Sequence, residues 1–343
     1  MQPNFVVSID FEQAWGMVAS KAYGSERASI VGARKAVPAI LEIAERYGIH
    51  CTWATVGLLF FDDRDELLNS LPEIRPNYKD PALSPYHRIH EIGRNEKEDG
   101  LHFGRSMISH IRDCPGQELA GHTFSHYYCL EDGGDPLAFE ADLAAARNAA
   151  ASLGVELKSI VFPRNQLRQS YLSVCNAAGY KCYRGNQRSH LHQARPRTDE
   201  RSWPRLFRGA DAYVPLTRTR EVNHPRRDGN MIDLAASRFL RPASSSAFLN
   251  RLQLRRIKNE MTNAAKQGGD FHLWWHPHNF GCNTDLNLLL LTAIFEHFRQ
   301  LTNDYGMVSK TMNALAEEAI SKEFVNASSI PLYRRGIARQ TTS

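Results

Sequence analysis

Short apolar segments that end in a polar or charged residue alternate with longer amphipathic segments along most of the chain. The short segments have the length and β-branched content of buried strands, whereas apolar residues in the longer segments recur with helical spacing. A repeated strand and helix order is typical of a parallel α/β architecture. The expected strands cover residues 5–9, 51–56, 118–121, 158–162, 180–184, 231–234, 271–276 and 306–309, and the expected helices cover 33–47, 137–153, 170–178, 286–301 and 311–320.

This pattern extends over residues 1–325, which we interpret as one α/β domain. Residues 187–230 interrupt the pattern with a run rich in Arg, Pro and His that has little periodicity. We expect a loop-rich insertion there, which either shapes a substrate groove or lies on the solvated surface. Residues 326–343 are polar and basic, and we expect them to form a flexible tail.

Composition excludes several classes of protein. Of the 343 residues, 42% are hydrophobic and 23% are charged, which is ordinary for a globular domain. No window approaches the run of about 18 apolar residues that a transmembrane helix needs. The N-terminal residues lack the basic and apolar regions of a signal peptide, so we expect a cytoplasmic protein. The six cysteines include no CxxC pair, so neither a thiolate zinc site nor a disulfide framework is indicated.

The charge balance bears on the partner. A net charge of +5 favours an anionic partner, and a nucleotide-linked sugar, a lipid pyrophosphate and a membrane surface bound peripherally are the alternatives. The excess is too small to choose among them. No nucleic-acid partner is expected, because acidic residues interrupt the only arginine-rich stretch, residues 195–227.

Reactive side chains fall at or just beyond the C-terminal ends of the expected strands. In parallel α/β folds these ends form the active-site face, so residues far apart in the sequence are expected to converge on one cleft. The residues in these positions are Asp10, Glu12, His122, Arg164, Arg184 and His276.

Two histidine pairs have a spacing of four residues. If a helical turn follows the strand at 118–121, His122 and His126 face the same side and can share a metal ion. His272 and His276 instead share an expected strand, where four residues span about 13 Å, too far for one metal. We therefore interpret His272 as a core or surface residue and assign the functional role to His276.

Asp10 and Glu12 lie two residues apart at the end of the first strand, so both carboxylates are expected on one face. One can bind a metal while the other acts as a base, and the spacing alone does not say which. Two imidazoles and one carboxylate leave coordination positions open, which is the catalytic rather than the structural pattern. The alternative is a pair of solvated loop acids.

Taken together, these motifs resemble the polysaccharide deacetylase family, also called the NodB-homology or carbohydrate esterase family 4 group. The resemblance covers residue 5 to about residue 320 and rests on residues 8–12 (SIDFE), 51–57 (CTWATVG), 121–126 (GHTFSH) and 273–276 (LWWH). It implies a distorted (β/α) TIM-like barrel with about seven strands and long loop insertions. The chain departs from the family pattern at residues 162–166 (FPRNQ), where Arg follows Pro, and it lacks the aspartate motif that orients the acid histidine.

The resemblance implies roles for the reactive residues. Glu12, in place of the usual aspartate, would hold a divalent metal with His122 and His126, Zn²⁺ first and Co²⁺ or Ni²⁺ as alternatives. Asp10 would act as the general base and His276 as the general acid, with His278 as a competitor for the acid role. Arg164 would keep Asp10 ionised if the two are in contact.

Residues beside these positions are candidates for substrate binding. Asn165 and Gln166 offer donors and acceptors to sugar hydroxyls, with loop capping as the alternative. Trp15 and Trp275 flank the catalytic segments and are candidates for stacking on a pyranose ring, with core packing as the alternative. His278 also belongs to this set.

The reaction expected from the resemblance is metal-dependent hydrolysis of an N-acyl group, acetyl first, from an amino sugar. The branch that it resembles acts in O-antigen or capsule biosynthesis, so a lipid-linked or nucleotide-linked glycan precursor is the expected substrate. Hydrolysis of another amide, such as a formamido sugar or a cyclic ureide, is one alternative. A glycan-binding module without catalytic activity is the other.

Overall fold

A computed structural model describes residues 1–17, 26–188, 196, 211, 213 and 222–328. Most of the expected insertion at 187–230, and residues 329–343 of the expected tail, lie outside the described residues. The strands are β1 (Asn4–Phe11), β2 (Cys51–Thr55), β3 (Glu118–Gly121), β4 (Ser159–Ile160), β5 (Cys182–Tyr183), β6 (Arg226–Asp228), β7 (Met231–Asp233), β8 (Arg238–Phe239), β9 (Asp270–Trp275) and β10 (Val308–Lys310). The helices are α1 (Arg27–Tyr47), α2 (Arg64–Asn69), α3 (Arg105–Asp113), α4 (Pro136–Ala151), α5 (Leu172–Ala177), α7 (Ala247–Lys266), α8 (Thr284–Tyr305) and α9 (Met312–Ser328).

The strands form one sheet in the order β6-β7-β5-β4-β3-β2-β1-β9-β8, and β10 also pairs with β1. Among the described strands, every pairing is parallel except that of β6 with β7. The predicted parallel α/β architecture is therefore confirmed. The sheet has ten strands, where the family resemblance implied about seven and the sequence pattern eight. The pattern missed β6 and β8, because with three and two residues they are too short to leave a pattern in the sequence.

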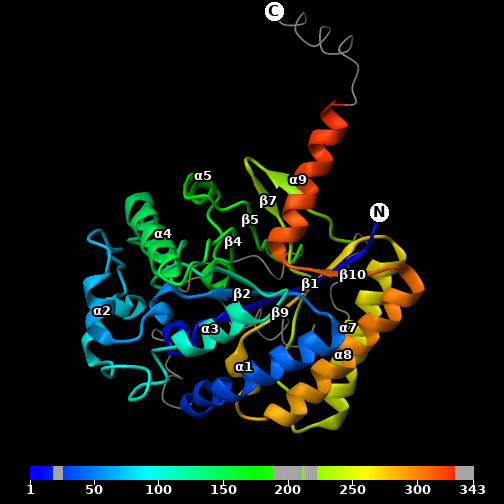
Figure 1. Cartoon of the computed structure of the whole chain (residues 1–343), viewed down its shortest axis with the longest axis horizontal. Coiled ribbons are helices and arrows are strands. Elements are labelled where there is room, and N and C mark those ends of the chain that lie inside the picture. The colour runs from blue at the N-terminus through cyan, green and yellow to red at the C-terminus, as the bar shows by residue number, and fades with distance from the viewer. Residues whose placement is uncertain (18–25, 189–195, 197–210, 212, 214–221, 329–343) are drawn as a thin grey trace, which may run out of the picture.

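The sheet is curled into an open half-barrel. β5 and β1 are separated by three strands, so in a flat sheet they would lie about 19 Å apart. Nevertheless Arg184, directly after β5, forms hydrogen bonds with Asp10 of β1 at 2.7 and 2.8 Å. The curl thus brings the C-terminal ends of distant strands to one place. Figure 1 shows the helices α1, α3, α7 and α8 on the outer side of this sheet.

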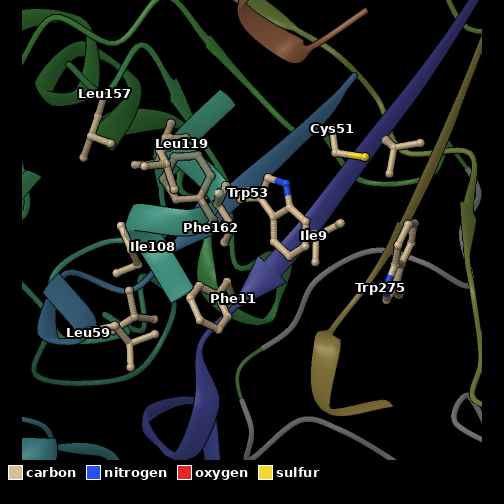
Figure 2. Packing of buried hydrophobic residues seen from close by; sticks show 14 of the residues in the cluster. Ile9, Phe11, Cys51, Trp53, Leu59, Ile108, Leu119, Leu157, Phe162 and Trp275 are labelled. Carbon is tan, nitrogen blue, oxygen red and sulfur yellow. The ribbon is translucent and has the colours of Figure 1, made fainter. Parts of the chain in front are cut away.

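The outer face of the sheet holds the main hydrophobic core. On β1, the side chains of Phe5, Val7, Ile9 and Phe11 belong to this core, and all four are fully buried. Figure 2 shows Ile9 and Phe11 beside Trp53 of the neighbouring strand β2. Alternate residues of β1 therefore point outward, which leaves Ser8 and Asp10 to face the inside of the half-barrel.

A second, smaller core lies on the inner face of the half-barrel. Val6, Ala54 and Val161 from the sheet pack there against Met312 and other residues of α9. α9 continues to Ser328, so the first three residues of the expected tail are helical. Among the described residues no helix combines the length and apolar content that crossing a membrane would need.

Candidate functional site

The C-terminal edge of the sheet gathers the reactive side chains. Asp10 is in β1 and Glu12 follows it, His122 follows β3, and His276 follows β9. The imidazole Nε2 of His276 is 3.6 Å from Glu12 Oε1 and 3.8 Å from Asp10 Oδ2. Glu12 Oε2 in turn is within 3.4 Å of both His122 and His126. The expected convergence of strand ends is thus seen directly in these distances.

A strained loop, and not a helical turn, brings the two histidines of residues 121–126 together. Thr123 and His126 have φ angles of 61° and 58°, in the left-handed region that non-glycine residues seldom adopt. Thr123 Oγ1 accepts a hydrogen bond from the backbone N–H of Tyr127 at 2.7 Å. Asp142 of α4 accepts from the backbone N–H of residues 124 and 125. These hydrogen bonds hold a backbone conformation that the sequence pattern does not reveal.

Glu12, His122 and His126 form a compact buried cluster. Their candidate ligand atoms all lie within 4.8 Å of one another, and each residue is at most 5% exposed. Glu12 Oε2 is 3.4 Å from His122 Nε2 and 3.0 Å from His126 Nε2. Burial raises the pKa of the Glu12 carboxyl, but the nearby imidazoles of the three site histidines outweigh it and hold that pKa well below its usual value. The carboxylate is therefore ionised at neutral pH.

The chemistry of this cluster fits a divalent metal ion. His122 Nδ1 lies 2.8 Å from the carbonyl oxygen of Val161 and must donate to it, so in the neutral ring Nε2 carries a lone pair. That buried Nε2 has no hydrogen-bond partner among the described residues, and it faces a carboxylate oxygen. Burial also lowers the pKa of His126, which favours its neutral form. Lone pairs that converge with a carboxylate are typical of a metal site, and a backbone carbonyl commonly orients a histidine ligand.

Asp10 is paired with Arg184, and this corrects the predicted partner Arg164. Arg184 Nη1 and Nη2 donate to the two carboxylate oxygens of Asp10 at 2.7 and 2.8 Å, in a bidentate pair whose side chains are 0% and 4% exposed. Burial raises the pKa of Asp10, but the charge and hydrogen bonds of Arg184 outweigh it and lower the pKa below its ordinary value. Both arginines follow strands at the same edge of the sheet, so strand-end position alone could not distinguish them.

Further polar residues support Arg184 inside the half-barrel. Ser8 Oγ accepts from Arg184 Nη1 at 3.0 Å and lies 2.9 Å from His272 Nε2. His272 is buried, so of the two alternatives, a core or a surface residue, it is a core residue. Burial and the charge of Arg184 lower the pKa of His272 to about 3, so this histidine is neutral at physiological pH. Asn165 Oδ1 accepts a fourth hydrogen bond from the guanidinium, at 2.9 Å.

His276 is half-buried and oriented by residues of the turn that follows β9. Its Nδ1 lies 3.2 Å from Asn279 Oδ1, which leaves Nε2 to face the two acids. The ring of His278 stacks on that of His276, with centroids 4.9 Å apart. Burial and the charge of His276 lower the pKa of His278 to about 4, so His278 packs behind His276 as a neutral ring.

Comparisons with known proteins bear on the fold. No protein-family model matches the sequence, and a comparison with curated proteins also gives no match. Among solved structures, a protein assigned as a polysaccharide deacetylase from Mycobacterium smegmatis is similar over 94% of this chain and 91% of its own, with 14% identity and a TM-score of 0.59. A second such protein, from Pseudomonas aeruginosa PAO1, is 10% identical over 92% of this chain and 90% of its own, with a TM-score of 0.50. This chain has the polysaccharide deacetylase fold.

A third structure with this fold has a different assigned activity. The Puue allantoinase is 9% identical, is similar over 92% of this chain and 89% of its own, and has a TM-score of 0.50. Solved structures with this fold therefore have different assigned activities. At these identities the likeness concerns the fold, and the residues of this chain must carry the functional argument.

Within the deacetylase fold of this chain, the two tryptophans expected to stack on a sugar are buried instead. Trp15 is 2% exposed and its indole N–H donates to the carbonyl of His102 at 2.8 Å. Trp275 is fully buried and stacks on Phe280; Figure 2 shows it among the core residues. Trp274, which is half-buried, is the tryptophan at the site, because the Arg184 guanidinium lies over its ring at 4.2 Å. Alternation along β9 from His276 could have identified Trp274 in the sequence.

The segment after β4 contributes less to substrate binding than expected. Gln166 is 1% exposed, and its amide bonds with the Leu130 N–H and the Glu131 carboxylate, so it stabilises a loop. Asn165 is half-buried and is engaged with Arg184. Arg164 is exposed, and its charge contributes to the lowered pKa of His126, which places it at the rim of the site. Arg164 and Asn165 have φ angles of 54° and 55°, so this rim has a strained backbone.

Proposed function

We propose that the protein is a metal-dependent hydrolase that removes an N-acyl group, most simply acetyl, from an amino sugar. The observation that carries this proposal is the buried Glu12, His122 and His126 cluster, with the acid His276 facing the same carboxylate. Asp10 and its paired Arg184 lie beside this cluster. A metal site flanked by a base and an acid is what amide hydrolysis requires.

Each residue has a role in this proposal that follows from its surroundings. Glu12, His122 and His126 would hold a divalent cation, Zn²⁺ first and Co²⁺ or Ni²⁺ as alternatives, which when bound supplies Lewis acidity towards water and a carbonyl group. Asp10, kept ionised by Arg184, accepts the proton of the attacking water at a carboxylate oxygen. His276 Nε2 donates a proton to the nitrogen of the departing amine, and Asn279 holds the ring so that Nε2 faces the reaction.

The substrate proposed is a surface-glycan precursor, such as an O-antigen or capsule unit, linked to a lipid or a nucleotide. Support comes from the motif resemblance and from the net charge of +5, which favours a substrate with phosphate groups. Trp274 offers an aromatic face beside Arg184 on which a pyranose ring can pack. The cytoplasmic location expected from the sequence is part of the same proposal.

A second candidate substrate is a cyclic ureide. The similarity to the Puue allantoinase favours it, since that protein has the same fold and its assigned substrate class also contains an amide-type bond. The residues described here suit either substrate, because both reactions need an activated water, a base and an acid. The products differ: acetate from an acetamido sugar, formate from a formamido sugar and a ring-opened acid from a ureide.

The test combines metal content with product analysis. We expect the purified protein to contain about one equivalent of divalent metal, and to release acetate from acetamido sugars in nucleotide-linked or lipid-linked form. His122→Ala/His126→Ala should lose both the metal and the activity. His87→Ala/His90→Ala is the matched control, because it also removes two histidines, both exposed. Metal absent from the wild type after reconstitution would refute the proposal, and a bound metal without any hydrolysis would favour a glycan-binding module.

A further inference from the structure

The surface of helix α7 has an unusual charge pattern. Residues 234–259 contain six Arg or Lys and no Asp or Glu. Arg238 and Arg256 are buried and pair with Asp211 and Glu260, so they serve the fold. Arg251 and Arg255 are exposed and Lys258 is half-buried, and none of these three pairs with an acid among the described residues. The outer side of α7 therefore presents uncompensated positive charge.

Apolar side chains lie on the same helix face as these cations. Phe248 is 63% exposed, which is unusual for a large aromatic residue. Together with part of α8, α7 lines a shallow open groove formed by Phe248, Arg251, Leu252, Arg255, Lys258 and His297. A helix that combines exposed cations with exposed apolar residues on one side is typical of a segment that lies on a membrane surface.

Helix α8 carries further exposed apolar residues. α7 and α8 pack side by side (Figure 1), joined by a hydrogen bond between Thr262 and His297. On the first two turns of α8, Leu286 and Leu289 are 37% and 66% exposed. α8 also carries the exposed acids Asp285, Glu296 and Asp304, so the positive charge belongs to α7. We name Phe248, Arg251, Arg255, Lys258 and Leu289 the α7–α8 surface.

This surface begins near the candidate site. α7 follows β8 and α8 follows β9, so both helices start at the edge of the sheet where the strands end. His276 lies at this edge, and α8 begins only a few residues after it. Phe248 and Leu289, in the first turns of the two helices, are thus at the end of the molecule that carries the reactive residues.

We propose that the α7–α8 surface docks the protein on an anionic phospholipid bilayer. The positive charge of α7 favours an anionic partner. The exposed Phe248 and Leu289 favour a bilayer, because a nucleic acid or a soluble polyanion has no apolar interior into which these side chains could insert. The biological purpose rests on the proposed function: docking here would hold the site next to a lipid-linked glycan. Binding to the bilayer itself does not depend on the activity.

The test is vesicle flotation with the purified full-length protein. The wild type should bind vesicles of phosphatidylcholine that contain phosphatidylglycerol, and should not bind pure phosphatidylcholine. R251E/R255E/K258E should weaken binding by about 100-fold or more, since each cation near a bilayer contributes about fivefold. F248S should weaken it by about tenfold. The matched control is K35E/K79E/K97E, which changes the net charge equally at exposed sites on other elements.

Three results would overturn the docking proposal. The first is that the wild type does not bind the vesicles, and the second is that the α7 and control triple variants lose binding equally. The third is full binding by F248S, which would indicate a surface that binds polyanions in general and not a bilayer. Acetate release from a water-soluble substrate, measured on the same preparations, separates the two proposals. Acetate release without vesicle binding refutes docking alone, whereas vesicle binding without acetate release refutes only the proposed function.

Discussion

Replacing Arg184 tests whether this residue, and not Arg164, controls Asp10. Arg184 is fully buried and binds both oxygens of a carboxylate that is itself 4% exposed. Arg184→Met would leave that carboxylate ionised, buried and without its counter-charge. Removing one partner of a buried ion pair costs about 3–5 kcal/mol. Loss of the contact between the guanidinium and Trp274 adds about 0.5–1 kcal/mol.

Urea unfolding measures the stability part of this prediction. Arg184→Met should lower the free energy of unfolding by about 3.5–6 kcal/mol, and Arg164→Met, at an exposed position, by less than about 0.5 kcal/mol. The double variant Arg184→Met/Asp10→Asn removes both charges. Its loss of unfolding free energy should therefore be about 2–3 kcal/mol smaller than the sum of the losses in the two single variants. Additive effects would show that the pair does not act as a unit.

The pH dependence of activity tests the functional part. Asp10 must be ionised to accept a proton, and Arg184 lowers the pKa of Asp10 against the opposing effect of burial. Activity should therefore be lost as pH falls through this low pKa. Without Arg184 the pKa rises, so the acid limb of the kcat/KM profile should move to higher pH. Our assignment of Arg184 as the partner of Asp10 would be refuted by the opposite result. In that case the acid limb of the profile would move in Arg164→Met and stay in place in an active Arg184 variant.

Four other substitutions have defined outcomes. Gly16→Ala should abolish metal content while the circular dichroism spectrum stays unchanged, because a Cβ there would lie 2.1 Å from Glu12 Cδ; retained metal would show that Glu12 is not a ligand. Trp274→Ala should raise KM with a small change in melting temperature, whereas Trp275→Ala should cost about 3–5 kcal/mol of stability, and the reverse order would contradict the placement of the two rings. Burial raises the pKa of Asp270 from 3.8 to about 6, so its stabilising contribution is complete below about pH 4 and is lost as pH rises through about 6. Asp270→Asn should therefore be more stable than the wild type at pH 7, by up to about 3 kcal/mol in urea unfolding, with the gap closing near pH 4.

The sequence alone was enough to place the reactive residues at one edge of a parallel sheet. Alternating strands and helices imply that strand ends meet there, and this holds for Asp10, Glu12, His122 and His276. The length of each strand was less well predicted: β4 and β5 have two residues each where five were expected. Short strands are defined by hydrogen bonds to their neighbours, which leave little periodicity in the sequence.

Only the tertiary structure decided which side chains meet. Arg164 and Arg184 both follow strands, but the curl of the sheet carries Arg184 across the half-barrel to Asp10 and leaves Arg164 exposed at the rim. Trp274 and Trp275 are adjacent in the sequence and lie on opposite faces of β9. A local pattern fixes the kind of element and the position of a residue along it. Contacts across the fold depend on sheet curvature and backbone conformation, and these arise from the packing of the whole chain.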